Sequence, residues 1–290
     1  MSTMSHSPRV AVLTGAGSGI GAAAAVQLAR AGLEVVLVGR SRHKLDRTVA
    51  AVAGVDGRKP ASYTADFAAM AQVRELGAEL AAAYPRIDVL ANNAGMIGGL
   101  RKTTVDGHEL TMQVNHLAPY LLTHELRAPL RAAGTARVIG TASIAEVWGI
   151  VDPDDLDGAR SRFHSRWLTY GSAKKANILF ALEASRRLGG AGIVATSFHP
   201  GIVRSNFGRS SLAFTLGKVL PFVYTSPGSA ADTLVHLATH ADGLAFPGGF
   251  FAQRRLRWST PDARDPELAR RLWDASAAAV GVSPDWLGLD

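Results

Sequence analysis

The order of three short patterns between residues 9 and 31 constrains the fold more than any other feature. Arg9 to Thr14 is an apolar, β-branched run that predicts a buried strand, and an alanine-rich segment ending at Ala31 predicts a helix. The glycines of residues 15–21 lie between them. Glycines let a backbone approach a pyrophosphate closely, and a helix N-terminus offers free N–H groups. This order predicts a dinucleotide-binding unit, although a glycine cluster alone also marks ordinary turns.

The alternation of strand-like and helix-like segments continues along the chain. Further strands are expected at 34–39, 61–65, 87–91, 137–141 and 193–198, and helices at about 68–84, 104–130 and 170–188. Pro119 marks a kink or a break in the second of these helices. The rhythm predicts an α/β protein with a doubly wound Rossmann fold, whose mostly parallel seven-stranded sheet has helices on both faces. A single catalytic domain over residues 9–290 is expected behind a flexible tail at 1–8.

Composition and charge argue against several classes of function. The chain has 290 residues, a formal charge of +7 and no cysteine, which excludes disulfides, thiolate metal sites and cysteine nucleophiles. Its basic residues are scattered without an aromatic-and-basic stripe, so nucleic-acid binding is not expected. The sequence contains no run of 18 uncharged apolar residues, so a transmembrane segment is not expected. The histidines show no zinc-ligand spacing, so no metal is expected, and the lack of cysteine suits a cytoplasmic location.

Polar residues and glycines follow directly after the expected strands. They are Gly15 to Gly21, Arg40, Asp66, Asn92 to Gly95, Ser143 and Pro200-Gly201. Ligands of such sheets bind beyond the carboxyl ends of the strands, so these residues predict one long crevice.

Arg40 bears on the choice of cofactor. An arginine at this strand end can pair with a 2′-phosphate, whereas a carboxylate would bond both ribose hydroxyls and indicate NAD. Arg40 therefore favours NADP, with Arg42 or Lys44 as possible helpers. NAD stays open, because these bases can also begin a solvated helix.

Tyr170 and Lys174 are the candidate acid–base pair. Four residues apart, they share one face of the expected helix. A phenol has an ordinary pKa of about 10, and a nearby cation favours the phenolate and lowers that pKa. The spacing is also common on exposed helix faces, so its meaning depends on the other motifs.

Taken together, these residues resemble the short-chain dehydrogenase/reductase family. The motifs that carry the resemblance are Thr14-Gly-x-x-x-Gly-Ile-Gly21, Asp66, Asn92-Asn-Ala-Gly95, Asn115, Ser143, Tyr170-x-x-x-Lys174 and Pro200-Gly201. They occur in the family's order and are jointly specific. Residues 114–124, residues 249–273 and the long interval from Ser143 to Tyr170 resemble the retinol-dehydrogenase-like branch more narrowly. This narrower similarity does not establish a retinoid substrate.

The resemblance implies a role for each matched residue in catalysis. Ser143 would hydrogen-bond the substrate oxygen, with Thr141 as a faint alternative. Tyr170 would exchange a proton with that oxygen. Lys174 would lower the pKa of Tyr170 and bind the nicotinamide ribose. Asn115 would support a water in a proton relay.

The resemblance also implies the cofactor contacts. The cofactor-binding residues would be Thr14, Gly15, Gly17, Ser18, Gly19, Ile20, Gly21, Arg40, Asp66, Phe67, Asn93, Ala94, Gly95, Tyr170, Lys174, Pro200, Gly201, Val203 and Ser205. Asp66 would contact the adenine, and the main chain up to Val203 would hold the nicotinamide carboxamide. Ser205 would supply a hydroxyl where many members have a threonine.

The residues after Gly201 concern the substrate. An apolar segment at 204–225 predicts either a lid over an apolar pocket or a helix packed on the body, with Met96, Trp148 and Trp167 lining the same space. His199 is expected to be structural or pocket-lining.

The expected function is that of an oxidoreductase transferring a hydride between NADP(H) and a bulky hydrophobic alcohol, ketone or aldehyde. The alternatives are an NAD-dependent enzyme of the same class, a non-catalytic NADP-binding sensor or scaffold, and a lipid-surface protein. The resemblance suggests a homodimer or homotetramer.

Overall fold

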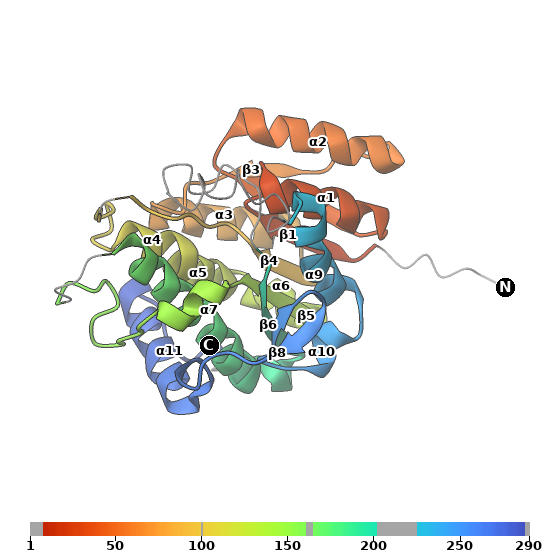
Figure 1. The fold of residues 1–290 in the computed structure, drawn as a ribbon. Helices are drawn as coiled ribbons and strands as arrows, with labels where there is room; N and C mark the ends of the chain where they lie inside the picture. The colour runs from red at the N-terminus through yellow and green to blue at the C-terminus, as the bar shows by residue number, and fades with distance from the viewer. Residues whose placement is uncertain (1–7, 100, 161–164, 202–224, 288–290) are drawn as a thin grey trace.

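An eight-stranded sheet runs through the described part of the chain in the order β3-β2-β1-β4-β5-β6-β7-β8 (Figure 1). The structure, a computed structural model, describes residues 8–99, 101–160, 165–201 and 225–287. The strands are β1 Val10–Thr14, β2 Glu34–Gly39, β3 Ser62–Thr64, β4 Val89–Asn92, β5 Ala136–Thr141, β6 Ile193–His199, β7 Phe250–Ala252 and β8 Arg255–Arg257. All neighbours pair in parallel except β7 and β8, which are antiparallel. The predicted doubly wound Rossmann fold is confirmed.

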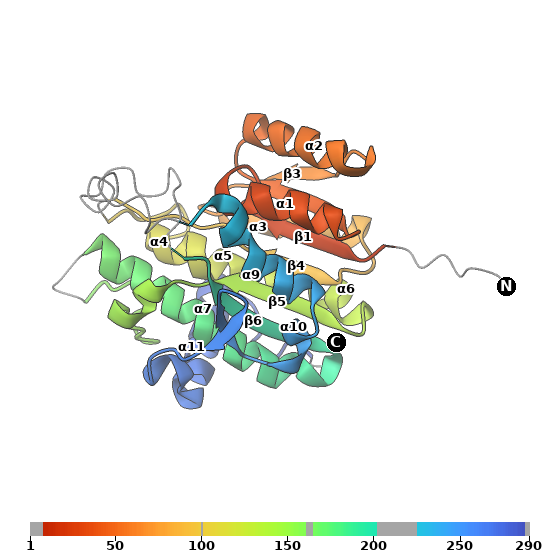
Figure 2. The ribbon, with the colours of Figure 1, turned by 45° about the vertical axis from the view of Figure 1, so that its right-hand side comes forward.

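Helices cover both faces of this sheet, as the two views of the ribbon show (Figure 1, Figure 2). They are α1 Gly19–Arg30, α2 Arg42–Asp56, α3 Met70–Ala83, α4 Leu110–Met112, α5 Ala118–Glu125, α6 Arg127–Ala132, α7 Arg166–Leu188, α9 Pro227–Thr239, α10 Asp242–Ala245 and α11 Pro266–Val280. The shorter turns are π-helical η1 Gln113–Leu117 and 3₁₀-helical η2 Ile144–Trp148, η3 Gly189–Ala191 and η5 Asp262–Arg264. Helix α1 packs between α2 and α9, while α3 packs on α5 and α7 on α11.

The central strands are buried on both sides, which explains their uninterrupted apolar sequence. In β1, Val10 and Val12 join the core beneath α3, α5 and α7. Ala11 and Leu13, the residues between them, join the core beneath α1, α2 and α9. Successive side chains of a strand point to opposite faces, so a strand covered twice has no polar side.

β8 is one strand more than the seven that were predicted. Its three residues, Arg255–Arg257, are all exposed and belong to a basic cluster rather than an apolar run. The turn that joins it to β7 places Gln253 at φ 53° and Arg254 at φ 60°. Glycine or asparagine is usual at positive φ in a hairpin turn, so neither the strand nor its turn carries a sequence signal.

The helix expected at 104–130 begins later and is interrupted. α4 starts only at Leu110, after an isolated bridge between Thr103 and Glu109, and the π-helical turn η1 follows it. The predicted break is confirmed, and it starts before the proline. Pro119 has no N–H for the carbonyl of Asn115 four residues earlier. That carbonyl instead accepts a hydrogen bond from Nδ2 of Asn177 at 3.0 Å.

Two expected segments lie outside the described residues. These are residues 1–7 of the tail and residues 202–224, which hold Val203, Ser205 and nearly all of the expected lid. Among the helices of the described ranges, none combines the length and apolarity needed to cross a membrane.

Candidate active site

The glycine loop between β1 and α1 closes tightly against the loop after β4. Gly15 has φ +70°, and a Cβ there would lie 2.9 Å from the Cα of Ala94. A Cβ on Gly21 would lie 2.2 Å from the Gly15 carbonyl oxygen, so a side chain cannot fit at either position without moving backbone. Ser18 is the N-cap of α1 but makes no capping hydrogen bond. The side chain of Ser18 therefore leaves the first-turn N–H groups of α1 uncapped, and a helix N-terminus with uncapped N–H groups fits a dinucleotide phosphate.

Thr14 has an internal role. Its hydroxyl donates to the Ala91 carbonyl at 3.2 Å and accepts from the N–H groups of Asn93 and Ala94, each at 3.0 Å. The side chain of Asn93 returns the contact, because its Nδ2 donates to the Thr14 carbonyl at 3.0 Å. These bonds fasten the end of β1 to the end of β4, so the Thr14 hydroxyl is committed to the fold.

Arg40 and Asp66 face each other beyond the ends of β2 and β3. A guanidinium nitrogen of Arg40 lies 3.9 Å from a carboxylate oxygen of Asp66, and the arginine side chain is 72% exposed. Arg42 lies in a different environment, where it donates to the Ser62 hydroxyl at 2.9 Å. Phe67 is buried in the core, which leaves only its main chain at the crevice.

A hollow of about 320 Å³ adjoins the outer side of the glycine loop. Its lining residues are Gly17, Ser18, Ala22, Arg47, Thr48 and Ala51. The Thr48 hydroxyl donates to the Ala16 carbonyl at 2.9 Å and so ties α2 to the loop. Arg47 is a basic residue that the sequence interpretation did not nominate, and its place on the helix that follows Arg40 was the available signal.

Tyr170 lies in the second turn of α7, opposite Ser143 at the end of β5. The two hydroxyls hydrogen-bond, and this bond acts to lower the pKa of Tyr170. Burial has the larger effect and raises the pKa of Tyr170 to about 12. The expected lowering of this pKa is therefore not found, and the phenol is protonated at neutral pH.

Lys174 is buried behind the phenol. Its Nζ donates to the Thr141 carbonyl at 2.8 Å and lies 5.5 Å from the centre of the Tyr170 ring, so the two side chains share one helix face as predicted. Burial disfavours the charged ammonium and lowers the pKa of Lys174 to about 7.

Asn115 connects this pair to the loop after β4. Its side-chain amide accepts from the N–H of Met96 at 3.1 Å and donates to the Met96 carbonyl at 2.9 Å. A Cβ on Gly95 would lie 2.6 Å from Oδ1 of Asn115 and 3.3 Å from Nζ of Lys174. Glycine at position 95 thus lets the loop pack directly against both side chains.

Asn177 is a residue that sequence reasoning missed. Its Nδ2 donates to the carbonyls of Asn115 at 3.0 Å and Thr141 at 3.1 Å. The Thr141 carbonyl thus receives both Asn177 and Lys174. One signal was available, since Asn177 follows Lys174 by three residues and lies on the same face of α7.

The remaining candidates around Ser143 have separate roles. The hydroxyl of Thr141 donates to Asn93 at 3.4 Å, away from the phenol, so it does not replace Ser143. His199 accepts from the N–H of Ile144 at 3.4 Å, and burial lowers its pKa, in keeping with a structural role. Gly201 has φ +85°, and a Cβ on this residue would lie 2.7 Å from the hydroxyl oxygen of Thr225.

Comparison with known proteins places the chain among dehydrogenases. Residues 9–152 match the family model described as short chain dehydrogenase. A Streptomyces sp. (strain C5) protein, named provisionally as a daunorubicin C-13 ketoreductase, is 47% identical over 273 residues, covering 94% of this chain and 93% of that protein. Human retinol dehydrogenase 13 is 34% identical over 283 residues, covering 94% of this chain and 85% of that protein.

Solved structures agree with this placement. A Mycobacterium paratuberculosis protein of uncharacterised function has a TM-score of 0.77 and 29% identity, covering 95% of this chain and 94% of that one. A Beutenbergia cavernae protein, named provisionally as an NAD(P)-dependent gluconate 5-dehydrogenase and bound to NADP, has a TM-score of 0.67 and 26% identity, covering 84% and 94%. The chain therefore belongs to the short-chain dehydrogenase/reductase family, in its retinol-dehydrogenase-like branch, and is an NAD(P)-dependent oxidoreductase.

Proposed function

We propose that this enzyme uses NADP(H) to interconvert a bulky hydrophobic alcohol and its ketone or aldehyde, with Tyr170 as the acid–base group. The observation that carries the proposal is an exposed apolar patch directly beside a buried proton-transfer centre. Ile144, Val147, Trp148 and Ile150 form this patch, with Trp148 62% and Ile150 69% exposed. A surface of this kind suits an apolar ligand.

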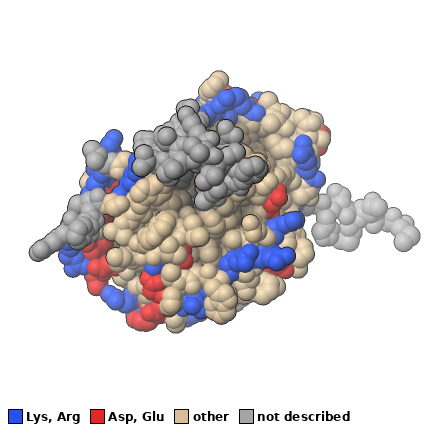
Figure 3. Space-filling model, in the orientation of Figure 1, with Lys and Arg blue, Asp and Glu red and all other residues tan. Residues whose placement is uncertain are grey.

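The patch is held against the turn that carries Tyr170. A Cβ on Gly171 would lie 2.4 Å from the Ala145 carbonyl oxygen, and the N–H of Ile150 donates to the Ser172 hydroxyl at 3.0 Å. Figure 3, a space-filling view in the orientation of Figure 1, shows a broad face with few charged side chains below the grey atoms. The names of two relatives, for a ketone of daunorubicin and for retinol, support a substrate of this class.

The reaction in the reducing direction needs one hydride and one proton. A bound nicotinamide supplies the hydride. Tyr170, protonated at neutral pH, would donate its proton to the substrate oxygen, while the Ser143 hydroxyl would donate a hydrogen bond to the same atom. Lys174, which is held by the Thr141 carbonyl beside the phenol, would stabilise the phenolate that remains.

A panel of alcohols and carbonyl compounds, assayed with NADPH and NADH, tests the proposal together with Tyr170→Phe. We expect kcat of this variant to fall by about 10²- to 10⁴-fold, because it loses the proton donor. Tyr63→Phe on β3 is the matched control and should keep wild-type kcat. Unchanged kcat in Tyr170→Phe would overturn the mechanism, and NADPH binding without turnover on any panel member would favour the sensor alternative.

The preference for NADP depends on Arg40, the exposed cation beyond β2. Removing a charged hydrogen-bond partner costs about 1.5–3 kcal/mol, so Arg40→Asp should weaken NADPH binding by about 10- to 150-fold. The affinities for NADPH and NADH should then differ less than in the wild-type protein. Arg42→Ala is the control, because Arg42 is bonded to Ser62. Equal affinities for NADPH and NADH in the wild-type protein would contradict the NADP preference, and tighter binding of NADH would assign the enzyme to the NAD-dependent alternative.

The patch itself is tested through the substrate. Trp148→Ala should raise KM for apolar substrates more than it lowers kcat, because the tryptophan provides binding area and no chemistry. Trp258→Ala is the control, since Trp258 is also highly exposed but stacks with Arg264 after β8. An effect of the same size in both variants would argue against the patch as the substrate surface.

We further propose a single catalytic domain over residues 9–290, with residues 204–225 as the lid, that acts in the cytoplasm as a homodimer or homotetramer. Light scattering during size-exclusion chromatography measures the assembly, and cell fractionation measures the location. A monomer, or a membrane-bound fraction, would contradict the corresponding part.

A further inference from the structure

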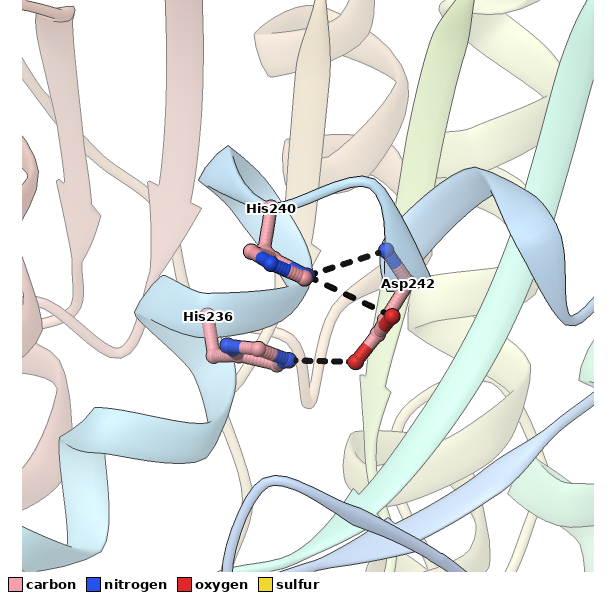
Figure 4. A group of neighbouring side chains, drawn as sticks. All are labelled: His236, His240 and Asp242. Carbon is pink, nitrogen blue, oxygen red and sulfur yellow. Dashed lines mark hydrogen bonds and ion pairs between the residues drawn. The ribbon is translucent and has the colours of Figure 1, made fainter.

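A cluster of three metal-ligating side chains lies at the junction of α9 and α10, outside the active site. His236 and His240 are four residues apart in sequence, and Asp242 points back towards both from the start of α10 (Figure 4). Nε2 of His236 lies 2.8 Å from one carboxylate oxygen of Asp242, and Nδ1 of His240 lies 3.3 Å from the other. The four-residue spacing of the two histidines is present in the sequence, although no metal site was expected from it.

The junction lies at the end of the sheet opposite the glycine loop. Arg137, at the start of β5, hydrogen-bonds the Ala238 carbonyl in the last turn of α9. The other end of β5 carries Thr141, whose carbonyl binds Lys174. The N-terminal end of α9 is fastened to α1, because Nε2 of Gln27 donates to the Gly228 carbonyl at 3.0 Å. The cluster is thus separated from the acid–base centre by the length of the central strand.

We propose that His236, His240 and Asp242 bind one divalent transition-metal ion, with zinc as the expected ion. Two imidazoles and one carboxylate form a nitrogen and oxygen ligand set that zinc accepts, with water completing the coordination. The three ligand atoms lie within 4.8 Å of one another. Zinc bonds of about 2.0–2.2 Å in a tetrahedron separate neighbouring ligand atoms by roughly 3.4 Å, so small side-chain rotations bring all three onto one ion.

Two further features favour an ion over an isolated ion pair. The imidazole rings lie with their centroids 4.4 Å apart, and each directs one nitrogen towards the carboxylate of Asp242 (Figure 4). Among the described residues, the ion pairs of Asp242 are with these two histidines and with no lysine or arginine. His240 is 57% exposed, which gives an ion access from solvent.

A bound ion at this place would join α9 to α10. Helix α9 packs along α1, so an ion that fixes the end of α9 would stabilise the folded chain. The cluster lies away from the acid–base centre, so the reaction would not need the ion. By mass action, any ligand that binds only the folded state raises the free energy of unfolding.

The test uses tag-free full-length protein dialysed against a chelator. Isothermal titration with ZnCl₂ measures affinity and stoichiometry, and visible absorption with CoCl₂ reports a protein-bound ion. We expect one equivalent of zinc to bind per chain and the Tm to rise with zinc concentration. The visible spectrum of bound cobalt should be that of an ion with a low coordination number. His240→Ala, an exposed substitution, should lose at least tenfold in affinity and the zinc-dependent rise in Tm. His43→Ala on α2 is the matched control and should retain both.

Asp242→Asn separates the ion from the ion pair. It keeps the size of the side chain and replaces the carboxylate by an amide, which is a weaker ligand for zinc, so we expect weaker zinc and cobalt binding than in wild type. Equal zinc affinity in wild type, His240→Ala and Asp242→Asn would overturn the proposal. An unchanged Tm of the wild-type protein on addition of zinc would also overturn it, because an ion pair without a bound metal gives no zinc-dependent rise in Tm.

Discussion

Burial acts on both members of the acid–base pair and favours the neutral form of each. It raises the pKa of Tyr170 to about 12 and lowers the pKa of Lys174 to about 7. These effects of burial outweigh the attraction between an ammonium and a phenolate, from which a lowered pKa of Tyr170 was expected. Four-residue spacing gives the proximity of two side chains, but the exposure that decides their pKa values depends on packing by distant segments.

Gly21 offers a sharp test of the glycine loop. A Cβ at this position would lie 2.2 Å from the Gly15 carbonyl oxygen, so Gly21→Ala must displace the loop backbone. We expect it to lower NADPH affinity by tenfold or more and to reduce thermal stability. Gly54→Ala is the control, because nothing lies within 4 Å of its Cβ position on α2. Alanine there should raise stability by about 0.4–1 kcal/mol. Normal NADPH binding by Gly21→Ala would show that the loop is not a phosphate cradle.

The motifs predicted the backbone geometry of the glycine loop better than the contacts of individual side chains. Glycine positions such as 15 and 21 followed from the backbone geometry that a phosphate loop needs, and the structure places them as expected. Thr14 begins the glycine motif and Phe67 follows the matched Asp66, yet the Thr14 hydroxyl fastens two strands and the Phe67 side chain fills the core. A motif records which residue occurs at a position, and the structure decides which way its side chain points.

At the scale of elements, the turn η1 and helix α7 form one unit through Asn177. Replacing Asn177 by alanine removes the amide donor from the carbonyls of Asn115 and Thr141. An unsatisfied buried carbonyl costs about 1–3 kcal/mol, so this variant should be less stable by about this amount. Because the Thr141 carbonyl also positions Lys174, kcat should fall on the order of tenfold. Thermal unfolding and steady-state kinetics measure the two effects, and unchanged kcat would show that Asn177 has no positioning role.

The predictability of elements depended on their length and burial. Strands such as β2, with an apolar run of full length, were predicted at their observed bounds. The break in the helix at 104–130 was predicted from Pro119, but the hydrogen bond from Asn177 to the Asn115 carbonyl within the π-helical turn comes from a residue far along the chain. β8 had neither an apolar pattern nor a turn residue, and only its pairing with β7 defines it.

At the scale of the molecule, His116 links the centre of the protein to its last helix. Its Nε2 lies 2.9 Å from the Ser276 hydroxyl on α11, and its Nδ1 lies 3.3 Å from Oδ1 of Asn177. Burial lowers the pKa of His116 to about 4. An unfolded histidine has a pKa of about 6.5, so between these values the unfolded chain binds the proton more readily. The contribution to stability is complete above about pH 6.5 and is lost as the pH falls to about 4.

This linkage predicts an acid-sensitive fold. The separation of the two pKa values corresponds to about 3 kcal/mol, because one pKa unit corresponds to about 1.4 kcal/mol. Denaturant unfolding at pH 7 and pH 5 measures the part of this difference that is lost above the folded-state pKa, about 2 kcal/mol, with His116→Gln as the variant that cannot titrate. We expect the wild-type protein to lose more stability than the variant between these values. An identical loss in both would assign the acid sensitivity to other groups.

The overall arrangement was predicted where local signals sufficed. The parallel sheet followed from the order of strands, loops and helices. The contacts of α11 did not, because Trp273 on Phe180 and Ser276 on His116 join residues from distant parts of the chain. Such pairs follow from the packing of helices and have no signature in a single sequence.

The sheet ends at β8, and this ending bears on how the protein behaves at high concentration. An edge strand presents unpaired backbone groups to which another chain can add a strand of its own. β8 is only three residues long, and two of them are arginines. Their like charges repel a second copy approaching edge to edge, and the short strand offers it few hydrogen bonds. The arginines that hid this strand from the sequence pattern thus make this edge of the sheet a poor template for another strand.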